Sequence, residues 1–176
     1  MTSLTIFLDD GGVMNENHIR GQQWQRLVGE FFVPILGGTP EAWGEANRIV
    51  APRLWERFRR SEYANTEADY GAWLHGDRLA WLREMCERVA VSPPEPDDDV
   101  LDLVCRAEAY VTRCVRAAFP GVTEAIRTLA GYGYTLHTAS GETSNELDGY
   151  LEGMGVRDCF GTLYGPDLIN TAKECS

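Results

Sequence analysis

The first hydrophobic feature of the chain is a short continuous run of apolar and β-branched residues. It covers residues 4–8 and stops at Asp9 and Asp10, which are followed by two glycines. A run without strict alternation is typical of a parallel strand that is covered on both faces. We therefore predict a buried first strand over residues 4–8, ending in a polar, glycine-rich turn.

From about residue 20 to residue 119, apolar residues recur with the period of an α-helix. We expect the first helix to end before Pro34, because the residue preceding a proline disfavours helical backbone. A second helix is predicted over residues 43–59, broken or kinked at Pro52, and a third after an N-cap at residues 66–69. A fourth follows three aspartates at positions 97–99, which favour a helix N-terminus over a metal site.

After residue 120 the pattern alternates between helix and strand. It predicts a helix over 122–130, a strand over 134–139, a helix over 143–154 and a strand over 161–164. Alternating strands and helices indicate a parallel sheet, and the long helical block exceeds an ordinary crossover. The predicted fold class is thus α/β, a Rossmann-like parallel sheet of about three strands with an inserted all-helical domain. The sheet domain would comprise residues 1–14 plus 117–176, and the insertion residues 15–116.

Composition and charge exclude several classes of function. The formal net charge of −11 argues against binding to nucleic acid or to an anionic membrane surface. The N-terminus shows neither a signal peptide nor a membrane span. Five cysteines, an odd number without metal-ligand spacing, favour reduced thiols and a cytoplasmic location. Five tryptophans recur at helical spacings, and we expect them in the core.

Three polar features coincide with strand ends. Asp9 ends the first predicted strand, Ser140 ends the second, and Lys173 lies shortly after the third. In open α/β sheets, ligands bind beyond the carboxyl ends of the strands. An acidic pair at one strand end can simply cap a turn, but three such features on one sheet edge favour a ligand site.

The segments that carry these residues resemble the sequence motifs of a known superfamily. The stretches LTIFLDDGGVM, FPGVTEAIRTLAGYGYTLHTASGE and FGTLYGPDLINTAKE resemble, in this order, the first three motifs of haloacid-dehalogenase-like (HAD) hydrolases. The helical block resembles a class I cap. The resemblance implies a hydrolase in which Asp9 attacks a small phosphorylated or halogenated substrate. It also implies that Ser140 donates a hydrogen bond to a substrate oxygen and that Lys173 neutralises negative charge.

The resemblance further implies positions for metal and substrate. In members that transfer phosphate, Mg²⁺ would be bound by Asp9, the backbone carbonyl of Gly11 and an acidic residue of a fourth motif. His18 and Arg20 lie where a cap begins, and they would either meet an anionic substrate group or be solvent-facing turn residues. The remaining substrate-binding candidates are the strand-end glycines Gly12 and Gly141.

Gly11 departs from the motif of most phosphatases in the superfamily, which carry a second aspartate there. That aspartate protonates the leaving group, and losing such assistance typically lowers the rate about 10²–10⁴-fold. Dehalogenases and phosphonatases also lack it. A phosphonatase would bring a lysine from its cap, whereas Lys173 is the single lysine of this chain. Gly11 therefore disfavours an ordinary phosphomonoesterase.

The second departure is that the sequence ends at Ser176, before a fourth motif. By resemblance the chain is then C-terminally truncated, and its apolar first strand lacks one neighbour. Unpaired apolar strands tend to associate, so we predict self-association. Together with Gly11, this leaves open an alternative: a degenerate HAD fold without catalysis that acts as a binding or scaffold protein.

Overall fold

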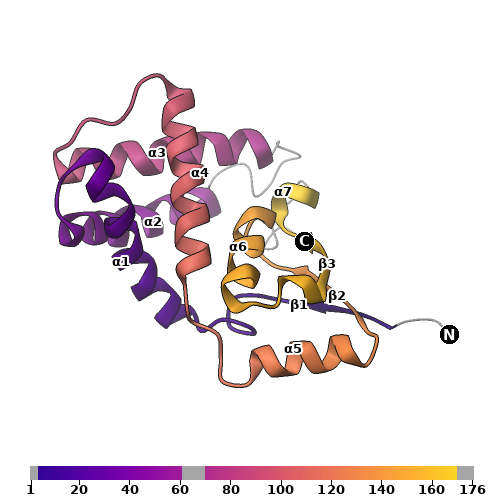
Figure 1. The fold of residues 1–176 in the computed structure, drawn as a ribbon. Helices are drawn as coiled ribbons and strands as arrows, with labels where there is room; N and C mark the ends of the chain where they lie inside the picture. The colour runs from indigo at the N-terminus through magenta and orange to yellow at the C-terminus, as the bar shows by residue number, and fades with distance from the viewer. Residues whose placement is uncertain (1–3, 61–69, 170–176) are drawn as a thin grey trace.

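The computed structural model describes residues 4–60 and 70–169, with the side chains of residues 58–60 left aside. Three parallel strands form its sheet: β1 (Thr5–Leu8), β2 (Thr135–Ala139) and β3 (Phe160–Tyr164) (Figure 1). The strand order is β1-β2-β3. The parallel α/β sheet predicted from the alternating pattern is thereby confirmed.

One face of the sheet packs against helices α5 (Val122–Gly131) and α6 (Ser144–Met154). The apolar cluster between them includes Leu136, Leu147 and Phe160, each at most 6% exposed. The other face carries Phe7, which is 55% exposed and stacks on His137 with ring centroids 5.5 Å apart. Among the described strands, β1 lies at an edge. The expectation that β1 is covered on both faces is therefore wrong for these residues.

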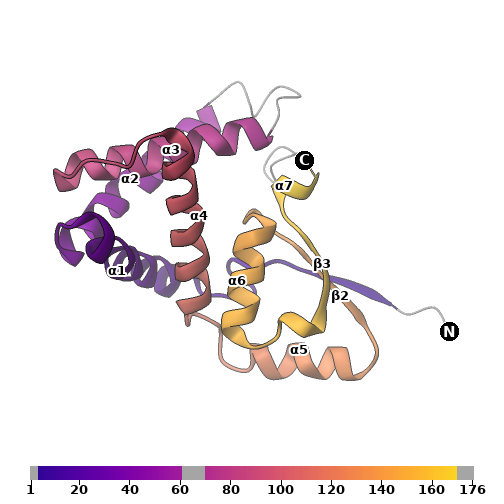
Figure 2. The same ribbon diagram turned by 45° about the horizontal axis from the view of Figure 1, so that its top comes forward.

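Four long helices form a separate block beside the sheet (Figures 1 and 2). They are α1 (Asn17–Leu36), α2 (Pro40–Arg60), α3 (Tyr70–Val89) and α4 (Asp97–Cys114). Their shared core is built around fully buried side chains such as Phe32, Trp43, Leu82 and Met85. The predicted helical insertion is confirmed, and the predicted domain boundaries stay predictions. None of the described helices is long and apolar enough to cross a bilayer.

Two prolines lie inside helices, contrary to the prediction that Pro34 ends the first one. Helix α1 continues through Pro34 to Leu36, and α2 continues through Pro52. Proline removes one backbone donor, so the carbonyl four residues earlier needs another partner. That carbonyl belongs to Glu30 for Pro34 and to Arg48 for Pro52, and both residues are exposed to water. Solvent can therefore replace the lost hydrogen bonds.

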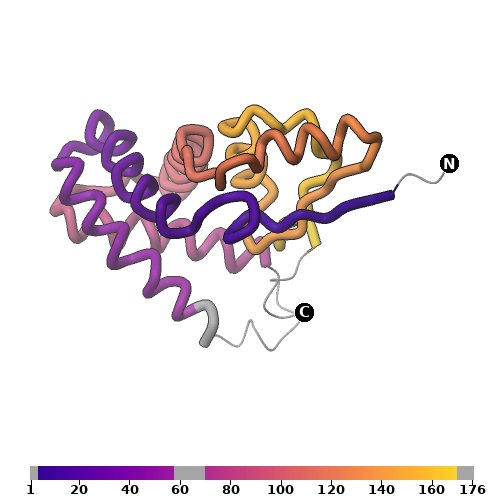
Figure 3. Tube along the Cα trace, turned by 90° about the horizontal axis from the view of Figure 1, so that it is seen from below, coloured from indigo at the N-terminus to yellow at the C-terminus, as the bar shows by residue number. Residues whose placement is uncertain are grey.

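Two chain segments, residues 9–16 and 115–121, connect the sheet to the helical block (Figure 3). They are hydrogen bonded to each other, from Glu16 N to Ala117 O at 2.8 Å and from Phe119 N to Met14 O at 3.1 Å. The short elements η2 (Arg157–Cys159) and α7 (Pro166–Ile169) flank β3. The paired connections hold the entry and exit of the helical block together.

The helical block also contacts the sheet domain through helix α4, which packs on α6; the two helices lie side by side in Figures 1 and 2. A Cβ built on Gly149 would lie 1.9 Å from Oγ1 of the buried Thr112. A Cβ on Gly153 would lie 2.7 Å from the carbonyl oxygen of Arg113. Only glycine permits so close an approach, so α6 presents a small-residue face to α4.

Candidate functional site

Asp9 lies directly beyond the last residue of β1, as the sequence predicts. Leu8 is in register with Thr138 of the neighbouring β2, two residues before the buried Ser140. Parallel strands end at the same edge of a sheet, so the structure brings Asp9 and Ser140 to one edge. The Asp9 side chain is partly exposed, and its Oδ1 accepts a hydrogen bond from the backbone N–H of Asp10 at 2.9 Å.

The backbone after Asp9 folds into a tight loop around the carbonyl oxygen of Asp10. This oxygen accepts hydrogen bonds from the backbone N–H groups of Val13, Met14 and Asn15, at 3.3, 2.9 and 2.9 Å. Gly12 adopts φ +77°, a conformation that disfavours residues with side chains. The glycine-rich turn is thus a physical requirement of this loop, independent of any ligand.

Asp10 is completely buried beneath this loop. Its Oδ1 accepts from Asn15 Nδ2 at 2.7 Å, and its Oδ2 accepts from Arg20 Nη1 at 2.5 Å. Burial raises the pKa of Asp10 to about 6, against the opposing effect of the Arg20 charge. The carboxyl group faces inward, where it ties the loop to helix α1.

Arg20 connects the helical block to the sheet domain through several partners. Besides Asp10, its guanidinium binds Glu142 Oε1 at 2.7 Å and lies 5.3 Å from the ring centroid of Tyr150. Glu142 also accepts a hydrogen bond from Ser140 Oγ. We call Arg20, Asp10, Glu142 and Ser140 the Arg20 cluster. The sequence leaves two alternatives for Arg20, contact with an anionic substrate group or a solvent-facing position; in the structure it is bound to the carboxylates of Asp10 and Glu142.

The other predicted residues have simpler surroundings. His18 is exposed and its Nε2 lies 2.8 Å from Gln22 Nε2. A Cβ built on Gly11 would lie 2.9 Å from Asn17 Oδ1 and 3.1 Å from Arg20 Nη2, so side chains occupy the space of an aspartate there. Lys173 lies outside the described residues. Within 4–60 and 70–169, no group of three or more His, Cys, Asp or Glu residues is placed to hold a metal.

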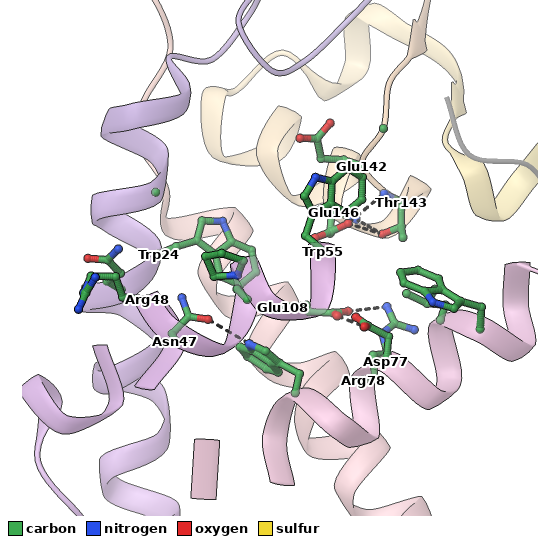
Figure 4. A pocket seen from close by; sticks show the side chains of 18 of the residues that line it. Trp24, Asn47, Arg48, Trp55, Asp77, Arg78, Glu108, Glu142, Thr143 and Glu146 are labelled. Atoms are coloured by element: carbon green, nitrogen blue, oxygen red, sulfur yellow. Dashed lines mark hydrogen bonds and ion pairs between the residues drawn. The ribbon is translucent and has the colours of Figure 1, made fainter. Parts of the chain in front are cut away.

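A cavity of about 640 Å³ lies between the helical block and the loop that follows β2. Gly141, Glu142 and Thr143 line it from the sheet domain, so it begins next to Ser140. The opposite walls come from α1, α2, α3 and Glu108 of α4, and they contain Trp24, Trp55, Trp73 and Trp81 (Figure 4). The structure therefore places a chamber above the sheet edge predicted to carry the chemistry.

Sequence reasoning missed most of this chamber. The prediction that all tryptophans are core residues holds for the buried Trp43 and Trp81 but is wrong for Trp55, which is 42% exposed. Asp77, a further wall residue, belongs to no motif, and Glu146, another, belongs only to the capping box that begins at Thr143. Asp77 lies at helical spacing between the apolar residues Leu74 and Trp81. A charged residue at such a position is the signal by which the sequence could have indicated a cavity there.

No protein-family model matches the chain, and no curated protein matches it either. Similar solved structures do exist. L-2-haloacid dehalogenase from Xanthobacter autotrophicus, with chloropropionic acid covalently bound, is 16% identical with a TM-score of 0.55, over 98% of this chain and 60% of its own. The putative HAD-hydrolase YfnB from Bacillus subtilis, bound to magnesium, is 13% identical with a TM-score of 0.54, over 99% of this chain and 71% of its own.

A third similar structure is CbbY from Rhodobacter sphaeroides in complex with xylulose-1,5-bisphosphate. It is 14% identical with a TM-score of 0.50, over 98% of this chain and 67% of its own. The chain thus spans 60 to 71% of the length of these three proteins. Identities this low concern the fold alone. On these grounds the chain has the fold of the haloacid-dehalogenase-like hydrolases, an α/β core that carries a helical cap.

Proposed function

We propose that the chain belongs to a hydrolase that uses Asp9 as a nucleophile on a small phosphorylated or halogenated substrate. One observation carries this proposal: Asp9 follows the end of β1, beside the end of β2 that leads to Ser140, and the residues directly after Ser140 line a cavity of about 640 Å³. In open α/β sheets ligands bind beyond the carboxyl ends of the strands, so a ligand at the sheet-domain wall of this cavity would lie at the sheet edge that carries Asp9.

In the proposed reaction, a carboxylate oxygen of Asp9 forms a bond to the electrophilic carbon or phosphorus. The bond to the leaving group breaks, and the leaving group departs with the electron pair. Water then cleaves the aspartyl intermediate and restores the carboxylate. Ser140 would turn its hydroxyl from Glu142 to a substrate oxygen, and Lys173 would neutralise negative charge, as the motif resemblance implies.

Gly11 favours leaving groups that need no proton. A halide or a weakly basic phenolate departs readily as an anion, whereas an alkoxide requires a general acid. Position 11 offers no such acid, and Asn17 and Arg20 fill the space where its side chain would lie. The arrangement therefore supports dehalogenation, or hydrolysis of an activated phosphate, better than hydrolysis of an alkyl phosphate.

For magnesium, the described residues offer only part of a site. Asp9 and the backbone carbonyl of Gly11 are suitable oxygen donors, but no group of three metal-binding side chains exists among the described residues. Mg²⁺ can complete its six ligands with water and substrate oxygens, so two protein donors are compatible with weak binding. When bound, the ion would stabilise the charge of a phosphoryl group. Dehalogenation has no such requirement.

The test compares two substrates on the same preparations. Halide release from 2-chloropropionate and phosphate release from p-nitrophenyl phosphate with Mg²⁺ are measured for the wild type and for Asp9→Asn. We expect release from at least one substrate, and a loss of at least about a thousandfold in Asp9→Asn, since a nucleophile has no substitute. Asp98→Asn, at the exposed start of α4, is the control that should keep full activity.

A second candidate is a binding or scaffold protein without catalysis. The observation that favours it is the Arg20 cluster, in which Asp10, Glu142 and Ser140 are already satisfied by one another and by Arg20. Equal background release by the wild type and Asp9→Asn on both substrates would sink the hydrolase proposal for this chain and leave this candidate.

A further inference from the structure

The chamber above the sheet edge has aromatic walls on three helices. Trp24 comes from α1, Trp55 from α2, and Trp73 and Trp81 from α3. Two of these indoles are held in place, because Trp24 Nε1 donates to Tyr150 Oη at 2.6 Å and Trp81 Nε1 donates to Asn47 Oδ1 at 3.0 Å. Indole rings are the best partners for a cation among the side chains, since their faces carry negative charge density.

The two arginines of the chamber are already neutralised. Arg78 donates to both carboxylate oxygens of Glu108, at 3.0 and 2.5 Å. Arg48 is exposed and bound to Glu45, and in Figure 4 it lies at the opposite end of the labelled residues from Asp77 and Glu108. Neither arginine therefore offers a free positive charge to a ligand inside the chamber.

The carboxylates of the chamber outnumber the cations available to them. Glu142 is paired with Arg20 and Glu108 with Arg78, whereas Asp77 and Glu146 form no ion pair among the residues whose side chains the structure describes, 4–57 and 70–169. Glu146 Oε2 accepts from the backbone N–H and the hydroxyl of Thr143, at 2.9 and 2.8 Å. Burial is the main cause that raises the pKa of Asp77 to about 6 and that of Glu146 to about 7; neighbouring acidic groups add to this effect, and Arg57 opposes it at Asp77. A cation placed beside the two groups would favour their charged forms.

We propose that this chamber binds a small organic cation, such as a primary or quaternary ammonium group, between its indole rings and the carboxylates of Asp77 and Glu146. The volume of about 640 Å³ falls in the range of small-molecule sites. Aromatic walls that surround a fixed negative charge are the usual environment for ammonium recognition. The inference concerns binding; only the identification of this cation as the remote end of a substrate rests on the proposed function.

An anionic occupant fits the chamber less well. A phosphate or carboxylate group would approach Asp77 and Glu146 and would have to displace Glu108 from Arg78 to find a cation. The anionic or halogenated end of a substrate belongs at the sheet edge near Asp9, and the cationic end in the chamber. A substrate with a positive group a few bonds from its reactive atom would satisfy both regions.

The experiment is a binding titration with a matched pair of probes, choline and its neutral isostere 3,3-dimethylbutan-1-ol. The intrinsic fluorescence of the chain reports on the chamber, because four of the five tryptophans line it. We expect choline to bind roughly tenfold more tightly than the alcohol, a ratio that corresponds to the upper range of a cation–π contact with charge pairing. Inorganic phosphate is the anionic probe and should give no saturable change.

The variants Asp77→Asn and Glu146→Gln remove charge with little change of shape. Gln retains the capping role of Glu146 at the start of α6, so the helix should persist. Each variant should weaken choline binding by about fivefold to tenfold and leave binding of the alcohol unchanged. Glu87→Gln, an exposed residue on the same helix as Asp77, is the matched control and should bind like the wild type.

Equal affinity for choline and its isostere, no saturable signal with choline, or tighter binding of phosphate would each overturn the inference. The Asp9→Asn variant separates binding from hydrolysis. If it binds choline normally while no hydrolysis is found in any protein, the proposed function fails and the cation site stands. If hydrolysis is found but choline is not preferred to the alcohol, the cation site fails and the proposed function stands.

Discussion

The Arg20 cluster and the chamber both contain carboxyl groups that are shielded from solvent, but only in the first is each of them paired with a cation. At the sheet edge, Arg20 lies 2.5 Å from Asp10 and 2.7 Å from Glu142, so one guanidinium balances two carboxylates. In the chamber, Asp77 and Glu146 have no such partner among the described residues. Unmatched buried charge weakens a fold. A protein that keeps it in a cavity is better explained by a ligand than by stability.

The comparison also separates two roles of the helical block. Arg20 extends from α1 into the sheet domain and fixes the block on it, while α2 and α3 contribute walls of the chamber. The same insertion therefore provides a rigid attachment at one end and a recognition surface at the other. Substitutions in the Arg20 cluster should therefore affect folding, and substitutions in the chamber should affect ligand binding.

The largest effect is expected from Arg20→Met, which leaves two carboxylates without their cation. Removing one partner of a buried ion pair typically costs about 3–5 kcal/mol. We expect a loss of this size in the free energy of unfolding measured by urea denaturation. The control is Arg26→Met on the same helix, since the Arg26–Glu30 pair is exposed and such pairs contribute within about 1 kcal/mol. Similar losses for the two variants would contradict the special role of Arg20.

The next effect tests whether α4 is fixed on α6. In Gly149→Ala the new methyl group would lie 1.9 Å from Thr112 Oγ1, so the helices must separate or the side chains must shift. Overpacking of this kind costs about 1–3 kcal/mol. Gly76→Ala in α3 is a matched control, because nothing lies within 4 Å of its added Cβ. It should stabilise the helix slightly. Equal urea midpoints for both variants would argue against a rigid attachment.

The pH dependence of stability reports on the three carboxyl groups whose pKa is raised by burial, whether or not an arginine is paired with them. The pKa is raised by burial to about 6 for Asp10, about 6 for Asp77 and about 7 for Glu146. A raised pKa means that the folded chain binds protons more readily than the unfolded one, so the free energy of unfolding should increase as the pH falls from 8 to 5.5. The gain should be on the order of 1 kcal/mol.

The same experiment on Glu146→Gln should give a flatter curve over this range, because the group with the highest pKa of the three is gone. The carboxyl groups with a lowered pKa, including Glu16, Glu45 and Glu124, change the free energy of unfolding only at pH values below this range. They therefore do not affect the comparison. A free energy of unfolding that falls steadily from pH 8 to 5.5, in either protein, would show that the carboxyl groups are better solvated than the structure indicates.

Local patterns predicted the features of the fold that depend on neighbouring residues. The apolar run before Asp9 and the alternation after residue 120 each set element boundaries within a few residues, and α4 begins at the predicted acidic run. The Arg20 cluster depends instead on residues far apart in the chain. Nothing local to Glu142 indicates that it faces Arg20, and nothing local to Asp77 shows that it borders a cavity.

Prolines show a second limit of local patterns. Pro34 and Pro52 oppose a helix by their own chemistry, yet both are inside one. The apolar stripes of α1 and α2 pack into the same core as Phe32, Trp43 and Val50, and this burial outweighs the loss of single hydrogen bonds. Tertiary packing decided both cases. The chamber is lined by residues of five helices and a loop that lie far apart in the sequence, so local patterns indicate it least of all.

The smallest effect on folding is expected at Phe7, an exposed apolar residue on the open face of the sheet. We propose that this face and the β1 edge mediate self-association, since exposed apolar strands pair readily. Sedimentation velocity at micromolar concentration should show dimers or larger species, and Phe7→Asp should shift them to monomer with little loss of stability. Tyr132→Asp is the control, because Tyr132 is 76% exposed in the turn after α5. A wild type that sediments as a monomer would contradict self-association through the open face of the sheet.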